Sequence, residues 1–297
     1  MSSIRVNPYP LPDLLEALSQ VQQQQDTATL QLSTGSKINT PSDDPIGAAQ
    51  LVQIAAQTGQ ADSYEQSIGD VTGQLSAAGS TLNSVVTTLQ QVISLGTEGA
   101  NGTLSSTDRA AIVNELTQIQ SQLISLANTS YQGQYLFAGT AGVAPYVADA
   151  NSPSGVTYNG NTGVNHVTIG NGYSLQVNLP GSQIFNGTGA DVFQSVNDLI
   201  TALNNDTGIG TAVNEVSTSY NYLSTQQVFY GNALDQAQSQ QTYLDSAKTQ
   251  LAQQQNTVGG ADEAALATQI TSDATAENAT LAAIAKLPQN TLFDYLQ

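Results

Sequence analysis

The stretch from Pro45 to Leu95 reads PIGAAQLVQIAAQTGQADSYEQSIGDVTGQLSAAGSTLNSVVTTLQQVISL. Its apolar side chains recur in alternating steps of three and four residues, the spacing of a helix that buries one stripe against a partner. About 50 helical residues at ~1.5 Å each predict a rod of roughly 75 Å, which is typical of coiled-coil and filament proteins rather than of globular enzymes. The stripe consists of Ile54, Ala61, Tyr64, Ile68, Val71, Leu75, Ala78, Leu82, Val85, Leu89 and Val92.

Two adjacent carboxylates stand at the start of this rod, in the run Pro41-Ser42-Asp43-Asp44-Pro45. Asp44 is the predicted N-cap, because an aspartate side chain accepts hydrogen bonds from the first free amides of a helix. Pro45 suits the first helical position, since it has no N–H to leave unpaired. The two acids could also do acid–base chemistry if their pKa values were split. Capping is the better explanation for a pair placed between prolines at a helix start.

A second seam of the same spacing precedes the rod. It predicts a helix that ends before Gly35, followed by a loop from Ser36 to Pro41. Its members are Leu11, Leu14, Leu18, Val21, Gln25, Ala28 and Leu32, of which Gln25 alone is polar.

A shorter helix is predicted after the rod. Ser106 or Thr107 can cap it, and Asp108 in its first turn is favoured by the helix dipole. It carries an apolar stripe, and the sequence then predicts a turn, a short strand and a turn over residues 131–139. The stripe is Ile112, Leu116, Ile119, Leu123 and Leu126.

The middle of the chain changes to a period of two, which predicts strands. The pairs Asn159-Gly160 and Asn171-Gly172 are typical of hairpin turns. We therefore expect one small antiparallel sheet over residues 140–190, followed by a short helix from Asp191 to Leu203.

The last third is helical again, in two segments. Gly259-Gly260 separates them, and Pro288 is expected to end the second. The first segment has a heptad frame made of Val213, Val216, Tyr220, Leu223, Gln227, Tyr230, Leu234, Ala237, Gln241, Leu244, Lys248 and Leu251. The second carries Ala267, Ile270, Ala274, Leu281 and Ile284.

These segments predict a mainly α fold: a long antiparallel, coiled-coil helical bundle formed by the N- and C-terminal parts, with a small inserted antiparallel β domain. The expected division is an assembly and export segment (1–40), two halves of a helical rod domain (41–139 and 211–258), the β-rich insertion (140–210) and a C-terminal assembly helix (259–297).

The amino-acid composition excludes several classes of function. Five Lys and Arg face 23 Asp and Glu, a formal net charge of −18, so we expect neither nucleic-acid binding nor docking on anionic lipid. There is no Cys and one His, which excludes thiolate metal sites and most histidine chemistry. No run is long enough for a membrane span or a secretory signal peptide, so we expect no membrane insertion. The sequence predicts no catalytic, cofactor-binding or metal-binding residue, hence no enzyme.

Only 9% of the residues are charged, against about 25% in an ordinary soluble protein. Long helices with so few ion pairs predict surfaces that become buried when subunits assemble. The predicted assembly seam comprises Leu18, Val21, Leu32, Leu75, Leu82, Val85, Leu89, Leu234, Leu244, Ile270, Leu281 and Ile284.

Residues 32–49, LSTGSKINTPSDDPIGAA, resemble the N-terminal signature of bacterial flagellins and flagellar hook-associated proteins. Within that family, the blocks at 101–109, 126–129 and 135–139 and the β pattern from Val156 to Phe185 are most similar to hook-associated protein 3, the hook–filament junction branch. Residues 292–296 fit the C-terminal domain of the family more loosely. The prolines Pro8, Pro10 and Pro12 depart from the family pattern. The signature residues are Gly35, Asn39, Pro41, Ser42, Asp43, Asp44 and Pro45.

The resemblance implies a structural subunit of the extracellular flagellum, exported unfolded by the flagellar type III apparatus without a cleaved signal. It implies terminal helices that order on polymerisation, and as partners further copies of the chain, hook-associated protein 1, flagellin and an export chaperone. One alternative is flagellin itself, the filament subunit. An alternative of another class is a surface glycan-binding module in the β domain.

Overall fold

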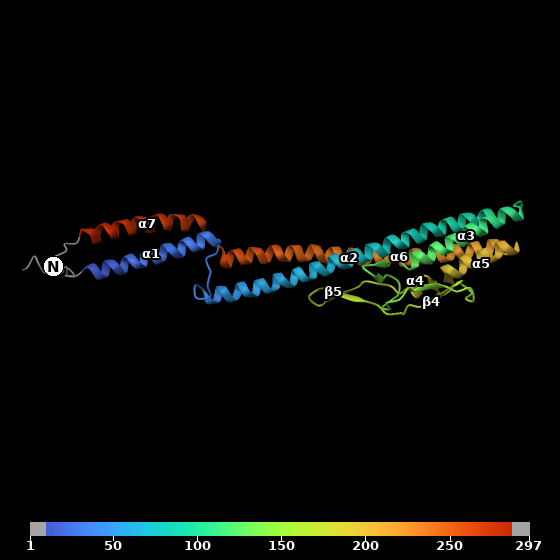
Figure 1. Cartoon of the computed structure of the whole chain (residues 1–297), viewed down its shortest axis with the longest axis horizontal. Helices are drawn as coiled ribbons and strands as arrows, with labels where there is room; N and C mark the ends of the chain where they lie inside the picture. Colours follow the sequence, from blue (N-terminus) through green and yellow to red (C-terminus); the bar gives the residue numbers. More distant parts are fainter. Residues whose placement is uncertain (1–9, 287–297) are drawn as a thin grey trace, which may run out of the picture. The chain divides into compact units, whose positions relative to one another are not determined.

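The computed structural model describes residues 10–286. Its helices form two units that are considered separately: one contains the residues up to Gly59 and from Ala247 onward, the other Gln60–Ser246. The helices are α1 (Pro10–Thr34), α2 (Pro45–Gly99), α3 (Ser106–Ala127), α4 (Gly181–Ile184), α5 (Val192–Asn205), α6 (Ile209–Gly259) and α7 (Glu263–Ala285), as drawn in Figure 1.

The apolar stripe of α2 is confirmed. All of its predicted members are buried except Tyr64, which is partly buried against the core. Within the second unit this stripe packs into one cluster with α3, α5 and α6. The heptad frame of α6 is confirmed in the same way, because Val216, Leu223, Tyr230 and Ala237 are buried in that cluster.

Helix α3 buries four of its predicted residues, and Ala127 in place of Leu126. Its N-cap is Ser105, so the prediction of Ser106 or Thr107 was wrong. The reason is a reciprocal pair: the Ser105 hydroxyl accepts from the Asp108 N–H at 3.2 Å and donates to the Asp108 carboxylate at 2.7 Å. Two hydrogen bonds at one position hold this cap more firmly than a single one.

The β region forms hairpins rather than the single predicted sheet. In the described residues every sheet has two antiparallel strands, and no strand exceeds five residues. Strands this short pack on the residues beneath them instead of extending a ladder. The pairs are β1 (Ser130–Tyr131) with β2 (Gln134–Tyr135), β3 (Tyr146–Ala148) with β4 (Val156–Tyr158), β5 (His166–Gly170) with β6 (Tyr173–Gln176), and β7 (Asn186–Gly187) with β8 (Ala190–Asp191).

One of the two predicted hairpin turns is confirmed. Gly172 has φ +72° between β5 and β6, a backbone conformation that glycine adopts without strain. The prediction for Asn159-Gly160 was wrong, because β4 pairs back to β3. The Asn159 N–H donates to the Pro145 carbonyl at 2.8 Å, and the loop beyond it is bonded to residues 138–140.

An aromatic cluster holds these hairpins against the helices. The ring centroids of Tyr146 and Phe193 lie 4.8 Å apart, and those of Phe137 and Phe185 lie 5.3 Å apart, edge to face. The Tyr146 hydroxyl donates to the Asn186 side-chain oxygen at 2.7 Å, and burial raises the pKa of this tyrosine above its ordinary value. The cluster therefore joins β3, α5 and the segment after β2 with neutral side chains.

Helix α5 agrees with the prediction of a short helix from Asp191 to Leu203. Asp191 is its N-cap and accepts from the Gln194 N–H at 2.9 Å.

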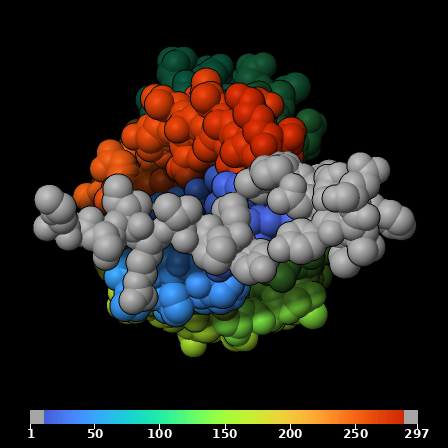
Figure 2. Space-filling view, turned by 90° about the vertical axis from the view of Figure 1, so that its left-hand side faces the viewer, coloured from blue at the N-terminus to red at the C-terminus, as the bar shows by residue number. Residues whose placement is uncertain are grey.

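In the first unit, α1 and α7 pair antiparallel. The Gln22 side chain donates to the Glu277 carboxylate at 2.9 Å, and Ser36 pairs with Gly260 at the opposite end. Figure 2 shows their side chains next to one another, α7 in red and α1 in dark blue. Helix α1 begins at Pro10 and includes Pro12, which the first turn tolerates. The expectations for Pro8 and Pro288 lie outside the described residues.

We expect Leu82→Ala to destabilise the second unit by about 2–5 kcal/mol, because Leu82 is fully buried and the truncation leaves a cavity. The measurement is urea unfolding followed by the helical circular dichroism signal. Val228→Ala, at an exposed position of α6, serves as the control and should change stability by less than about 0.5 kcal/mol. Equal unfolding midpoints for both variants would contradict the assignment of the α2 stripe as the core.

Candidate assembly surfaces

The loop between α1 and α2 is built around one carboxylate. Asp43 accepts hydrogen bonds from the Asn39 N–H at 2.9 Å, the Thr40 N–H at 2.8 Å and the Thr40 hydroxyl at 2.8 Å. The Thr40 N–H first, then the Thr40 hydroxyl and the Asn39 N–H, hold the pKa of Asp43 below its ordinary value of 3.8. The charged form of the carboxylate therefore stabilises this loop.

The neighbouring signature residues complete the turn. The Asp43 N–H donates to the Thr40 carbonyl at 3.1 Å, which makes a turn with Pro41 at its second position, where the fixed φ of proline is favoured. The Ser42 hydroxyl lies 2.8 Å from the Thr40 hydroxyl. Gly35 has φ +66° where the chain leaves α1, a conformation that ends many helices at glycine.

Asp44 caps α2, as the sequence predicts. Its carboxylate accepts from the Ile46 N–H at 3.1 Å and the Gly47 N–H at 2.9 Å. Pro45 is the first residue of the helix. A β-carbon at Gly47 would lie 2.5 Å from the Ile38 side chain and 2.6 Å from the Asp44 carboxylate, so a larger residue here would require Ile38 and the capping carboxylate to shift. The two acids thus act in turn formation and capping.

The loop also bonds to the link between α6 and α7. The Lys37 N–H donates to the Gly259 carbonyl at 2.8 Å, and the Ala261 N–H donates to the Gly35 carbonyl at 3.0 Å. The Ser36 hydroxyl donates to the Gly259 carbonyl at 3.1 Å. We call residues 35–44 together with 259–261 the joint. Sequence reasoning missed this partner: the Gly259-Gly260 pair was interpreted only as a helix stop, although two glycines also allow a close backbone approach.

The α1 side of the helix pair follows the predicted seam over most of its length. Ala28 is buried, and Leu14, Leu18, Val21 and Gln25 are partly buried. Leu32 departs from the prediction and is 38% exposed. The antiparallel register brings the alanine-rich start of α7 alongside this end of α1, and small side chains cover less of a leucine.

The α7 side differs from the prediction. The stripe of α7 that faces α1 consists of Leu266, Ile270, Asp273, Glu277, Thr280 and Ile284. Ile270 and Ile284 are shared with the predicted seam, but Leu281 lies outside it and is 46% exposed. In this arrangement Leu266 faces α1 in place of Ala267, and Glu277 accepts the hydrogen bond from Gln22. It also turns Asp273 inward, and one of its carboxylate oxygens is buried without a hydrogen-bond partner among the described residues.

The remaining predicted seam residues lie within the chain's own second unit. Leu75, Leu82, Val85 and Leu89 are fully buried, Leu244 is nearly so, and Leu234 is partly buried. These side chains are covered by the same chain, so they offer no surface to a second copy. Their predicted part in subunit assembly stays a prediction, and the contacts that the structure gives them lie within one chain.

Large apolar side chains are instead exposed on the first unit. Leu15 and Leu30 on α1 are about half exposed, as is Leu281 on α7. Ile46 and Val52, near the start of α2, are 75% and 71% exposed. Apolar side chains exposed to this extent are candidates for contact with another protein.

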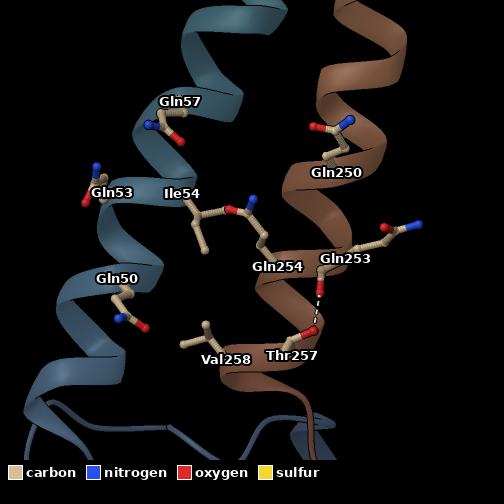
Figure 3. Close-up of a pocket in the computed structure, with 9 residues that line it drawn as sticks. All are labelled: Gln50, Gln53, Ile54, Gln57, Gln250, Gln253, Gln254, Thr257 and Val258. Atoms are coloured by element: carbon tan, nitrogen blue, oxygen red, sulfur yellow. Dashed lines mark hydrogen bonds between the residues drawn. The ribbon is translucent and has the colours of Figure 1, made fainter.

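A groove lined by amides lies between the start of α2 and the end of α6, within the first unit. Its volume is about 700 Å³. Gln254 reaches from α6 toward Ile54 on α2 (Figure 3). None of the six glutamine side chains here bonds to another described residue. We call it the amide groove; its lining is Gln50, Gln53, Ile54, Gln57, Gln250, Gln253, Gln254, Thr257 and Val258.

Comparison with known protein families finds a match that includes the loop between α1 and α2. Residues 12–142 match the model of the bacterial flagellin N-terminal helical region. The chain carries a flagellin-type N-terminal region. This region contains nearly all of α1, residues 35–44 of the joint, α2, α3 and the β1–β2 hairpin.

Two relatives show where the likeness lies. The chain is 34% identical over 167 residues to flagellar hook-associated protein 3 of Salmonella typhimurium, covering 56% of this chain and 49% of that protein. It is 31% identical over 128 residues to flagellin A of Vibrio anguillarum, covering 43% and 34%. The chain thus spans about half the length, or less, of the curated relatives it matches. The predicted resemblance of this chain to hook-associated protein 3 is confirmed.

The fold has a counterpart among solved structures. The crystal structure of Bacillus cereus FlgL matches 69% of this chain and 99% of its own, with a TM-score of 0.60 and 20% identity. A likeness at this identity concerns the fold, and it agrees with the predicted class: a helical bundle of N- and C-terminal segments with a small β insertion.

The described residues offer nothing that resembles a metal centre or a membrane span. Residues 10–286 contain no group of three or more His, Cys, Asp or Glu side chains that could hold a metal ion. No helix within that range is long and apolar enough to cross a bilayer.

We expect a ¹³C-detected titration of the Asp43 carboxyl to give a midpoint below 3.8. Because the folded-state pKa is lowered, Asp43 contributes its stabilisation above the ordinary pKa and loses it as the pH falls through the folded pKa. Asp43→Asn should therefore make the joint more sensitive to proteolysis at neutral pH. Asp70→Asn, at an exposed position of α2, should not. A midpoint at or above 3.8 would refute the role of Asp43.

Asp273→Leu should stabilise the α1–α7 pair by about 1–3 kcal/mol, because it removes a desolvated carboxylate that lacks a partner. Native-state hydrogen exchange of the α7 amides measures this directly. Asn278→Leu, on the exposed side of α7, controls for the added apolar surface. Unchanged or faster exchange in Asp273→Leu would show that the carboxylate carries no penalty.

Proposed function

We propose that this chain is a non-catalytic structural subunit of the bacterial flagellum that joins the hook to the filament. The observation that carries the proposal is the combination of a flagellin-type N-terminal region with a longer stretch of similarity to hook-associated protein 3 than to flagellin A. The exposed leucines on the first unit support it, because a helix pair that leaves leucines in water gains stability when another subunit covers them.

The proposal gives the chain's regions different tasks. Segments 1–40 and 259–297 assemble with neighbouring subunits, 41–139 and 211–258 form the lateral rod, and 140–210 occupies the outer surface. The partners are further copies of the chain, hook-associated protein 1 on the hook side, flagellin on the filament side, and a chaperone before export through the flagellar type III apparatus. The place of action is outside the cell. The net charge of −18 argues against a nucleic-acid partner.

Ordering and burial would decide the energetics of assembly. Among the described residues of the first unit, the buried apolar side chains are Ala28, Ile54 and Leu266. Fixing the backbone of such helices costs roughly 1–2 kcal/mol per residue. Covering the exposed leucines of α1 and α7 with neighbouring subunits would offset part of that cost, so incorporation would be coupled to stabilisation of the helix pair.

We expect deletion of the gene in its own bacterium to leave hooks without filaments and to release flagellin into the medium, since the junction would be missing. Electron microscopy of cells and gel analysis of the medium measure this. The wild-type chain should restore filaments, and Leu15→Asp with Leu281→Asp should not, because two carboxylates would enter the proposed contact. Val228→Asp is the control on the second unit.

Normal filaments in the deletion strain would refute a junction role. If the chain is instead the main protein of sheared filaments, the alternative of a filament subunit holds, because a junction needs few copies and a filament needs many.

A further inference from the structure

The helices that form the amide groove carry no ionisable side chain over a long stretch. Residues 45–61 of α2 contain none, and neither do residues 249–261 at the end of α6. Elsewhere the chain carries enough acid to give a net charge of −18. Two copies of such a chain repel one another wherever carboxylates approach within the Debye length, about 8 Å at physiological salt. The groove is therefore a place where a second copy can approach without that repulsion.

The lining also specifies the chemistry of an occupant. An amide has both donors and acceptors, and the six glutamine side chains of the groove bond to no other described residue. An amide-rich surface can satisfy both kinds of group at once, whereas a charged side chain would lose its hydration against neutral partners. The groove thus fits a neutral helix face that carries glutamines.

The first unit presents such a face on α1. A second, smaller hollow of about 430 Å³ is lined by Gln20, Gln23, Gln24, Thr27, Ala28 and Gln31 of α1 and by Gln269 of α7. It contains no charged residue. Gln31 donates to the Lys37 carbonyl at 3.0 Å, whereas the side chains of the other glutamines have no hydrogen-bond partner among the described residues. The two amide surfaces are different patches of one molecule, so a contact between them is heterologous, and heterologous contacts build rings or helical arrays rather than closed dimers.

We propose that the amide groove between α2 and α6 receives the glutamine face of α1 from a second copy of this chain. This inference rests on the proposed function, because assembly of copies is what the contact would serve. It adds the two surfaces, the direction of the contact and its chemistry, which is neutral amide hydrogen bonding.

Disulfide cross-linking tests the contact directly, because the sequence contains no cysteine. Full-length Gln57→Cys and Gln24→Cys chains are prepared separately, mixed, concentrated by salting out with ammonium sulfate and oxidised. Each chain has a single thiol, so every disulfide joins two molecules. The control pair is Gln57→Cys with Gln118→Cys, since Gln118 is an exposed glutamine on α3.

We expect severalfold more covalent heterodimer from Gln57→Cys with Gln24→Cys than from the control pair. Equal yields would overturn the proposal. Predominant Gln57→Cys homodimer would overturn it as well, because it would mean that groove meets groove. Mass differences from an uncleaved tag on one chain distinguish the heterodimer from either homodimer.

A second experiment separates this proposal from the junction function. In the deletion strain, Gln53→Glu with Gln57→Glu should restore severalfold fewer filaments than the wild-type chain, while Gln118→Glu should restore them fully. Full restoration by the groove variant would overturn the groove contact and leave the junction function intact. Failure of the wild-type chain to restore filaments would refute the junction function, and the cross-linking result would still decide whether the two amide surfaces meet.

Discussion

Burial of the α2 stripe is the interaction on which the second unit depends. Leu75, Leu82 and Leu89 are fully enclosed, and α3, α5, α6 and the aromatic cluster share one apolar core with them. Among the described residues of the first unit, few apolar side chains are buried. One continuous helix therefore runs from a part that is stable by its own packing into a part whose apolar groups are largely exposed.

The sequence predicted well whatever depends on local chemistry or on a long repeat. Asp44 and Pro45 begin α2 as expected, because a cap needs only the residues beside it. The stripes of α2 and α6 were predictable because their period holds over many turns. The buried face of α7 was not predictable in this way. The predicted stripe and the observed stripe both contain Ile270 and Ile284, and only contacts with α1 decide which of the two is buried.

The other departures have the same origin in long-range contacts. The hairpins follow the aromatic cluster around Tyr146 and Phe185, whose members are scattered along the chain. In the joint, residues 35–37 are hydrogen-bonded to residues 259–261. No local sequence pattern predicts a partner so distant along the chain. Of the candidate site, the signature residues and their capping role could be predicted, whereas the contacts that make them a joint, and the amide groove, could not.

The joint has a mechanical consequence. Its two backbone hydrogen bonds, Lys37 to Gly259 and Ala261 to Gly35, link the two places where the chain leaves the α1–α7 pair. Without these bonds, tension on the α1–α7 pair would pass separately along the loop to α2 and the link to α6. The more tightly stretched of these two segments would then carry nearly all of the force. Because the two hydrogen bonds connect these segments, part of the force on one segment passes to the other, so α2 and α6 share it.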